Sequence, residues 1–152
     1  MPSVLFFQDG GFYYVQEENA LEIGNKAVSY HMDGYNCAQS VLAAAGEYTC
    51  LEESAALAIS AGFGGGLRCG EVCGAVSGAV MALGLCFPFS DCEDSEAKAK
   101  IAALAAEYCS EFKERFGGIR CADIVGDRSH CSEYISAAAE MLEKFIKNNK
   151  EK

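Results

Sequence analysis

The sequence predicts an all-α fold, a single domain of five or six helices with a buried central helix of small residues, with room for a short β-hairpin at the N-terminus. Three observations lead to this prediction. The chain has 152 residues, which is the size of one domain. Apolar residues recur at every third or fourth position in several long stretches. The segment from Glu71 to Leu85 is almost uncharged and rich in glycine and alanine, which favours a buried helix that its neighbours approach closely.

The N-terminal segment differs from the rest of the chain. Residues 1–18 are expected to form an extension or a hairpin, because two runs of aromatic and β-branched residues flank a turn signal at residues 9–11. An isolated hairpin is marginally stable, so we expect this one to pack on the helical body or on a partner chain. Residues 19–148 are expected to form the helical, cysteine-rich domain, and residues 149–152 a frayed tail.

The first two helices are predicted from periodicity and capping. A helical pattern begins at Glu18 and is broken at residues 33–35. Asn36 and Gln39 then have the spacing of a capping box, in which each side chain accepts a hydrogen bond from the other residue's backbone N–H. This predicts a second helix with Cys37 in its first turn.

The next two helices follow from the same kind of signal. Thr49 and Glu52 also have capping-box spacing, which predicts a helix that runs to about Gly62. A glycine-rich loop then leads into the central helix, which we expect over residues 71–85. Pro88 closes it.

The clearest helical pattern covers residues 91–116, where apolar and charged residues alternate with a period of three to four. The glycine pair at 117–118 is expected to end it. Residues 121–125 are long enough for one helical turn. Asp127 or Ser129 is expected to cap the last helix.

Charge and composition exclude several classes of protein. The net charge of −10 argues against binding to nucleic acid and to anionic membranes. No uninterrupted apolar run reaches transmembrane length and no signal-peptide pattern is visible, so we expect no membrane insertion. Nine cysteines, an odd number, do not suit a secreted disulfide scaffold. We therefore expect a cytoplasmic location, where cysteines stay as thiols, bind metal or react.

The nine cysteines separate by position. Four lie at or near predicted loop-to-helix junctions, where free N–H groups and the helix dipole stabilise a thiolate; these are Cys37, Cys73, Cys121 and Cys131. Four others are assigned to packing or to the surface: Cys50, which opens the helix predicted there, Cys86, Cys92 and Cys109. Whether Cys69 joins the site is left open. The chain has no C-x-x-C motif, and its spacings fit no standard zinc or ferredoxin pattern.

Four blocks of the chain carry a resemblance to a known family. They read "GYNCAQSVL", "AGFGGGLRCGEVCGAVSGAVMALGL", "FGGIRCADIVG" and "HCSEYISAAAEML". In this order they resemble the family named for the pattern C_GCAxxG_C_C and described as redox-active, over roughly residues 20–145. The family's CGAxxG motif falls on residues 73–78, and its four characteristic cysteines fall on Cys37, Cys73, Cys121 and Cys131. The resemblance implies a redox role for these four.

The glycine-rich loop has two interpretations. Gly64, Gly65, Gly66 and Gly74 are candidate cofactor-binding residues, because glycines adopt positive φ and can expose N–H groups toward a thiolate or a bridging sulfide. Alternatively they only permit a tight connection and close helix packing. We further predict that Cys73 is the most reactive thiol, since it would lie in the first turn of the central helix with Arg68 nearby.

The functions that remain are few. In the first, the four cysteines undergo thiol–disulfide chemistry or hold a [2Fe–2S] cluster for electron transfer, so the chain would be an oxidoreductase or an electron-transfer protein. In the second, they form a structural Cys₄ zinc site. In the third, the chain is a non-catalytic helical interaction module. The resemblance implies an unidentified redox partner, associated with a transporter in some relatives, and the sequence is compatible with a homodimer.

Overall fold

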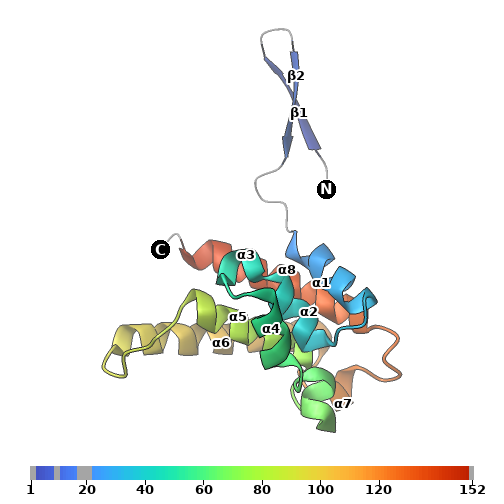
Figure 1. The fold of residues 1–152 in the computed structure, drawn as a ribbon, viewed down its shortest axis with the longest axis vertical. Helices are drawn as coiled ribbons and strands as arrows, with labels where there is room; N and C mark the ends of the chain where they lie inside the picture. The colour runs from blue at the N-terminus through green and yellow to red at the C-terminus, as the bar shows by residue number, and fades with distance from the viewer. Residues whose placement is uncertain (1–2, 9–10, 17–21, 151–152) are drawn as a thin grey trace.

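The computed structural model describes residues 3–8, 11–16 and 22–150, and the protein is built from helices apart from one small N-terminal sheet (Figure 1). The predicted all-α class is thereby confirmed. The helical elements are α1 (Ile23–Met32), α2 (Cys37–Ala44), α3 (Gly46–Thr49), α4 (Glu53–Ser60), η1 (Gly66–Gly70), α5 (Gly74–Cys86), α6 (Ser95–Phe116), α7 (Cys121–Ile124) and α8 (Cys131–Lys150). None of the helices in the described residues combines the length and the apolar composition needed to cross a bilayer.

The N-terminal sheet has two antiparallel strands, as predicted. Strand β1 (Ser3–Gln8) pairs with β2 (Gly11–Gln16) in a register that sets Ser3 opposite Gln16 and Gln8 opposite Gly11. The first two residues of the predicted turn lie outside the described residues. Packing of this segment on the helical body or on a partner chain stays a prediction. At the other end, α8 extends through Lys150, and the last two residues of the predicted tail lie outside the described part.

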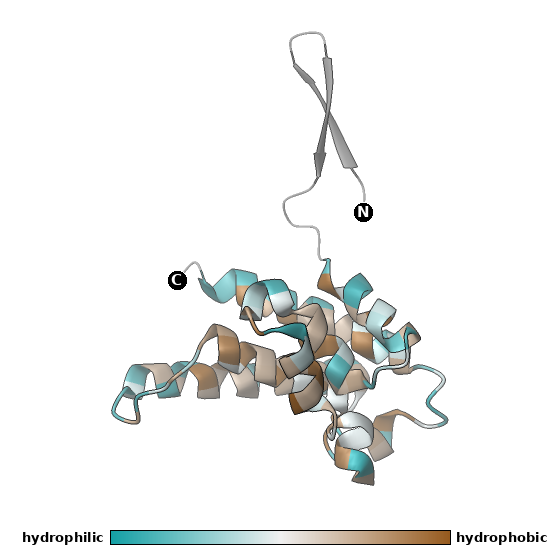
Figure 2. Ribbon diagram, in the orientation of Figure 1, coloured by the Kyte–Doolittle hydropathy of each residue, from teal (hydrophilic) through white to brown (hydrophobic). Residues whose placement is uncertain are grey.

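The core is organised around α5. This helix packs against α2, α8 and α6, and Figure 2 shows it as a mostly apolar element inside the helical body. Its small residues set the packing distance, because a Cβ built on Gly78 would lie 2.6 Å from the carbonyl oxygen of Ala38 in α2. The predicted buried helix of small residues is therefore present, and it begins at Gly74 rather than at residue 71.

The helix count differs from the prediction. The described residues contain eight α-helices where five or six were expected, because α3 and α7 are single turns of four residues. The capping box at Asn36 is confirmed, with Gln39 N donating to Asn36 Oδ1 and Asn36 N donating to Gln39 Oε1, both at 3.0 Å. The box predicted at Thr49 is wrong: Thr49 Oγ1 accepts from Leu51 N, and α4 begins after Glu52 without a side-chain cap.

Of the signals predicted at the ends of the last two long helices, one is confirmed and one is wrong. Gly117 ends α6 in the left-handed conformation, as predicted. The cap predicted for α8 is wrong, because Asp127 Oδ1 accepts from the backbone N and the hydroxyl of Ser129 within a tight turn. The helix begins two residues later, at Cys131.

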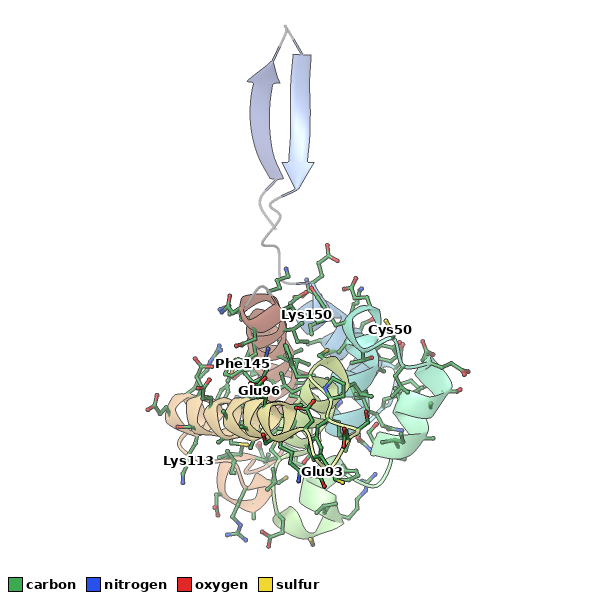
Figure 3. The ribbon with its side chains drawn as sticks, turned by 90° about the vertical axis from the view of Figure 1, so that its left-hand side faces the viewer. Cys50, Glu93, Glu96, Lys113, Phe145 and Lys150 are labelled. Carbon is green, nitrogen blue, oxygen red and sulfur yellow. The ribbon has the colours of Figure 1, made fainter. Side chains whose placement is uncertain are left out.

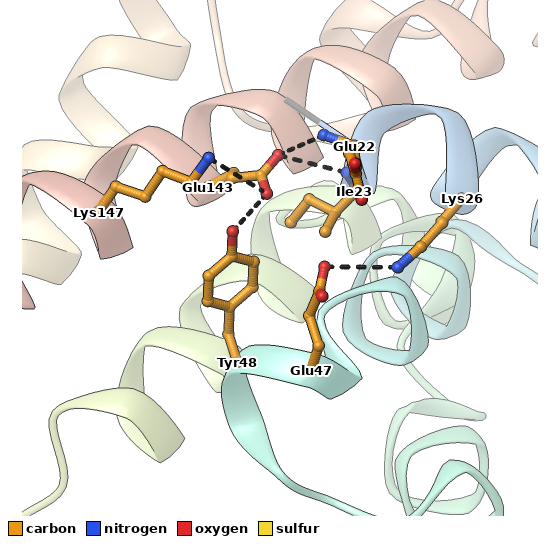
Figure 4. Close-up of polar contacts among 7 residues, drawn as sticks. All are labelled: Glu22, Ile23, Lys26, Glu47, Tyr48, Glu143 and Lys147. Atoms are coloured by element: carbon orange, nitrogen blue, oxygen red, sulfur yellow. Dashed lines mark hydrogen bonds and ion pairs between the residues drawn. The ribbon is translucent and has the colours of Figure 1, made fainter. Parts of the chain in front are cut away.

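A buried carboxylate joins three of the helices (Figure 4). Glu143 of α8 is only 1% exposed. Its Oε1 accepts from the backbone N of Glu22 at 2.7 Å and of Ile23 at 3.3 Å, at the start of α1. Its Oε2 accepts from the Tyr48 hydroxyl of α3 at 2.6 Å and lies 3.9 Å from Lys147 Nζ. Every polar atom of this carboxylate thus has a partner.

Candidate functional site

The structure brings the four predicted cysteines to one small pocket. They come from four different helical elements and surround a cavity of about 30 Å³. The lining consists of Cys37, Gly65, Cys73, Cys121, Val125, Arg128, Cys131, Tyr134 and Ile135. Cys73 and Cys121 are buried, whereas Cys37 and Cys131 are half-buried. All four are free thiols in this structure.

Each of the four cysteines stands where a helix begins. Cys37, Cys121 and Cys131 are the first residues of α2, α7 and α8, and Cys73 directly precedes α5. Helix N-termini carry unpaired backbone N–H groups and the positive end of the helix dipole. The pocket is therefore a place where several helices present positive potential to sulfur atoms.

A short backbone bridge fixes the two buried cysteines. Val72 and Arg120 form an isolated antiparallel β-bridge. On either side of it, Cys73 N donates to Ile119 O and Cys121 N donates to Glu71 O, both at 2.7 Å. Because side chains alternate along extended backbone, both cysteines point to the face opposite Val72 and Arg120. This pairing of two segments far apart in the sequence could not be anticipated from either one alone.

Glycines allow the segments to meet around the cysteines. A Cβ on Gly74 would contact Cys37 Sγ, and it would lie 2.8 Å from Phe63 O. A Cβ on Gly64 would lie 2.6 Å from Asn36 Cβ, next to the cap of α2. Gly74 must lack a side chain for α2 and α5 to approach, and Gly64 must lack one for its loop to pass the cap of α2. The packing interpretation of these two glycines is therefore the one with geometric support.

The other two candidate glycines have positive φ, as the sequence suggested. Gly65 and Gly66 both have φ of +65°. Gly65 lines the pocket, and a Cβ on Gly66 would lie 2.9 Å from Cys121 Cβ. The unusual backbone continues into Leu67 and Arg68, with φ of 60° and 61°. A role of the four glycines in holding a cofactor stays a prediction.

The environment of Cys73 differs from the prediction. It is 3% exposed, and burial is the main cause that raises the pKa of its thiol to about 12. The neighbouring Cys37 raises this pKa further, while backbone hydrogen bonds from Ala75 and Val76 lower it. The expected stabilisation by the helix N-terminus is present, but desolvation outweighs it. The raised pKa argues against the prediction that Cys73 is the most reactive thiol.

The two cysteines that follow α6 have a cation beside them. Burial raises the pKa of the Cys121 and Cys131 thiols, and Arg128 acts in the opposite direction on both. Sequence reasoning missed Arg128 and named Arg68, which is exposed and does not line the pocket. The signal that could have found it is its place three residues before Cys131. Tyr134 was also missed; it lines the pocket, and its hydroxyl donates to Ile124 O at 2.6 Å.

The remaining cysteines lie outside this pocket. Cys69 is exposed, does not line the cavity, and its Sγ is 3.5 Å from Gly66 O. Cys86 and Cys109 are half-buried, and Cys92 is exposed. Cys50 does not open a helix as predicted; it ends α3 in the left-handed conformation, with φ of 57°.

The fit of a metal centre can be judged from the donor atoms. Zinc and iron–sulfur sites need thiolates whose sulfurs surround a common point, with Zn–S distances of about 2.3 Å. Across residues 22–150 the structure contains no group of three or more His, Cys, Asp or Glu side chains arranged to hold a metal ion. The four cysteines share a pocket without forming a ligand set in this conformation.

Comparison with known proteins gives one finding. A family model described as "Putative redox-active protein (C_GCAxxG_C_C)" matches residues 35–145. This range contains all four pocket cysteines and Arg128. No curated protein and no solved structure matches the chain. Because the match covers well over half of the sequence, the chain belongs to the C_GCAxxG_C_C family.

Proposed function

We propose that this protein is a thiol–disulfide redox protein whose active centre is the four-cysteine pocket. One observation supports this above all others. Four cysteines from four helical elements meet at a single small cavity, each at the start of a helix. Cysteines used only to fill space would not converge on one cavity; Cys109, for example, is half-buried away from this pocket.

The exposure of the four thiols suggests a division of roles. Cys37 and Cys131 are half-buried at the pocket, and Cys73 and Cys121 are buried behind them. An outer thiolate would attack one sulfur of a partner disulfide, forming a mixed disulfide and releasing the partner's other sulfur as a thiolate. An inner thiol, after losing its proton, would attack the outer sulfur, and the second partner thiolate would leave. Two electrons pass to the partner, and one disulfide remains in the pocket.

The charges around the pocket suit this chemistry. The Arg128 guanidinium favours thiolate at Cys121 and Cys131, and the positive helix ends act in the same direction. Burial opposes both effects, because it raises the pKa of these two thiols. Cys131 is half-buried and lies three residues after Arg128, which makes it our candidate for the attacking thiol.

A second candidate is an electron-transfer protein with a [2Fe–2S] cluster, and the number of cysteines favours it. Thiol exchange needs two cysteines, whereas such a cluster is held by four. The cysteines Cys37, Cys73, Cys121 and Cys131 would hold the cluster, and the glycine-rich loop and Arg128 would face it. The described conformation does not present these sulfurs as a ligand set, so the thiol form remains our first proposal. A Cys₄ zinc site uses the same residues and is the structural alternative.

The deciding experiment begins with anaerobically purified full-length protein. Iron, zinc and acid-labile sulfide are measured together with the visible spectrum. The thiol proposal predicts sub-stoichiometric metal. If iron and sulfide are found together with broad visible absorption, the cluster proposal replaces the thiol proposal. If zinc is found in stoichiometric amount, the structural zinc site replaces it.

The same protein is then equilibrated with graded ratios of oxidised and reduced dithiothreitol, and free thiols are alkylated and counted by peptide mass spectrometry. We expect at least two pocket cysteines to become protected together, with one midpoint. Cys92, exposed and outside the pocket, is the internal control and should stay free. Four pocket cysteines that all stay reduced in metal-free protein would rule the proposal out. The redox partner, the homodimer and the cytoplasmic location stay predictions.

A further inference from the structure

A second pair of cysteines lies at the other end of α5. Cys86 is the last residue of this helix, and Cys50 directly follows α3. The two helices pack against each other. The Cys86 thiol donates to Tyr48 O at 3.6 Å, so its sulfur lies against the last turn of α3, two residues before Cys50 in the sequence.

The electrostatic environment of Cys86 includes a third group, the ammonium of Lys150. Burial is the main cause that raises the pKa of its thiol; Lys150, at the end of α8, lowers it, and the Cys50 thiol raises it again. Figure 3 shows Cys50 and Lys150 toward the same end of the helical body. Two thiols and an ammonium group are thus gathered where α3, α5 and α8 end.

The pair is separate from the four-cysteine pocket. Cys73 and Cys86 stand at opposite ends of α5, which has 13 residues. At a rise of about 1.5 Å per residue the helix is roughly 20 Å long, too far for direct exchange between sulfurs. Whatever chemistry occurs at Cys50 and Cys86 therefore does not depend on the function proposed for the pocket.

We propose that Cys50 and Cys86 form a reversible disulfide, a second oxidation site of this protein, with a low-molecular-weight disulfide as oxidant. The exposed Cys50 thiolate attacks the oxidant RSSR, which forms a Cys50–S–S–R bond and releases RS⁻. The half-buried Cys86 thiolate then attacks the Cys50 sulfur and releases the second RS⁻. Two protein thiols are oxidised, one external disulfide is reduced to two thiols, and the two protons pass to solvent and to the RS⁻ products.

The product would tie α3 to the end of α5. Tyr48 in α3 also donates to Glu143, so this cross-link would restrain the helix that completes the buried network of α1 and α8. The left-handed φ of Cys50 is a conformation that a residue with a side chain adopts at some cost, and it is held by the backbone bond from Cys50 N to Gly46 O at 2.9 Å.

The test uses the full-length protein and glutathione disulfide as the oxidant. After incubation, remaining thiols are alkylated, and the protein is digested without reduction. Mass spectrometry should find the Cys50 peptide joined to the Cys86 peptide. In the variant Cys86→Ser, which retains a hydroxyl donor for Tyr48 O, the first step should occur without the second. The glutathione adduct on Cys50 should then accumulate to roughly tenfold above its level in the wild type.

The variant Cys92→Ser is the matched control, because Cys92 is exposed like Cys50 but is not among the groups that act on the Cys86 thiol, and it should form the cross-link like the wild type. Circular dichroism checks that Cys86→Ser is folded. Equal adduct on Cys50 in the wild type and in Cys86→Ser, with no joined peptide, would overturn the proposal. No Lys or Arg lies between Cys37 and Cys50 or between Cys73 and Cys86, so the digestion uses chymotrypsin, which cleaves after Tyr48 and after Leu85. The pocket cysteines then fall on other peptides, and their oxidation is scored separately.

Discussion

Two of the places where helix N-termini meet polar side chains in this protein differ in their result. At the start of α1, Glu143 accepts two backbone N–H bonds and the Tyr48 hydroxyl, so the buried charge is fully partnered. At the four-cysteine pocket, the starts of α2, α5, α7 and α8 surround a cavity of about 30 Å³ lined by free thiols. The first arrangement is complete and serves stability. The second leaves four thiols around a cavity, two of them buried and two half-buried, which suits the function proposed for this pocket.

The strongest test of this contrast is the reactivity of the inner thiol. A pKa of about 12 for Cys73, against the ordinary 9.0, lowers the thiolate fraction at pH 8 by three orders of magnitude. We expect Cys73 to be alkylated at least about 10³-fold more slowly than the exposed Cys92. Competitive alkylation of metal-free reduced protein, read by mass spectrometry, measures both rates in one sample. Equal rates would mean that Cys73 is not shielded from solvent as described.

Breaking the hydrogen-bond network of Glu143 should destabilise the protein more than a substitution at the four-cysteine pocket does. Glu143→Ala leaves the Tyr48 hydroxyl and two N–H groups of α1 without their acceptor, and we expect a loss of about 3 kcal/mol in the free energy of unfolding. Urea denaturation followed by circular dichroism measures it. Glu107→Ala, on the exposed face of α6, is the control and should change stability little. Similar losses in both variants would show that the network is not what stabilises this region.

Close packing at the pocket can be tested with one substitution made twice in α5. Gly74→Ala places a Cβ against Cys37 Sγ and 2.8 Å from Phe63 O, so overpacking should cost about 2 kcal/mol. Gly84→Ala meets nothing within 4 Å and should be neutral or stabilising by about 0.5–1 kcal/mol, because alanine favours the helix. Thermal unfolding compares the two. If Gly74→Ala were as stable as Gly84→Ala, the approach of α2 to α5 would be looser than described.

The smallest expected effect is a dependence of stability on pH. The pKa of Cys73 is raised in the folded state, so its contribution is complete below the unfolded value of 9.0 and is lost as pH rises toward 12. At pH 10 the loss is about 1.4 kcal/mol relative to pH 7. Cys73→Ala removes this group, so its unfolding free energy should fall less between pH 7 and pH 10. Tyrosines titrate in both proteins and cancel in the comparison. Parallel pH curves for both proteins would contradict the raised pKa.

Local signals predicted much of the fold. The box at Asn36 and the glycine at 117 involve residues within one turn of each other, so sequence spacing was enough. The box at Thr49 failed because the same hydroxyl satisfies a nearer backbone group, the N–H of Leu51. Competition between two local partners is decided by backbone geometry, which spacing does not contain.

The cysteines of the site were predicted, but their surroundings were not. Position at helix starts identified Cys37, Cys73, Cys121 and Cys131, and the structure places all four at one pocket. The environment of each could not be predicted, because desolvation of Cys73 depends on segments distant in sequence. The Val72–Arg120 bridge and the place of Arg128 are tertiary features of the same kind.

The spread of the pocket cysteines along the chain has a consequence for biosynthesis. The pocket needs residues from Cys37 to Cys131, and α8 supplies both Cys131 and Glu143. A nascent chain emerges from its N-terminus, so Cys37 and Cys73 would leave the ribosome well before their later partners. Until α8 has been synthesised, neither the pocket nor the hydrogen bonds from the start of α1 to Glu143 can form. The twenty residues of α8 therefore decide when the growing chain acquires both its buried carboxylate network and its complete pocket of cysteines.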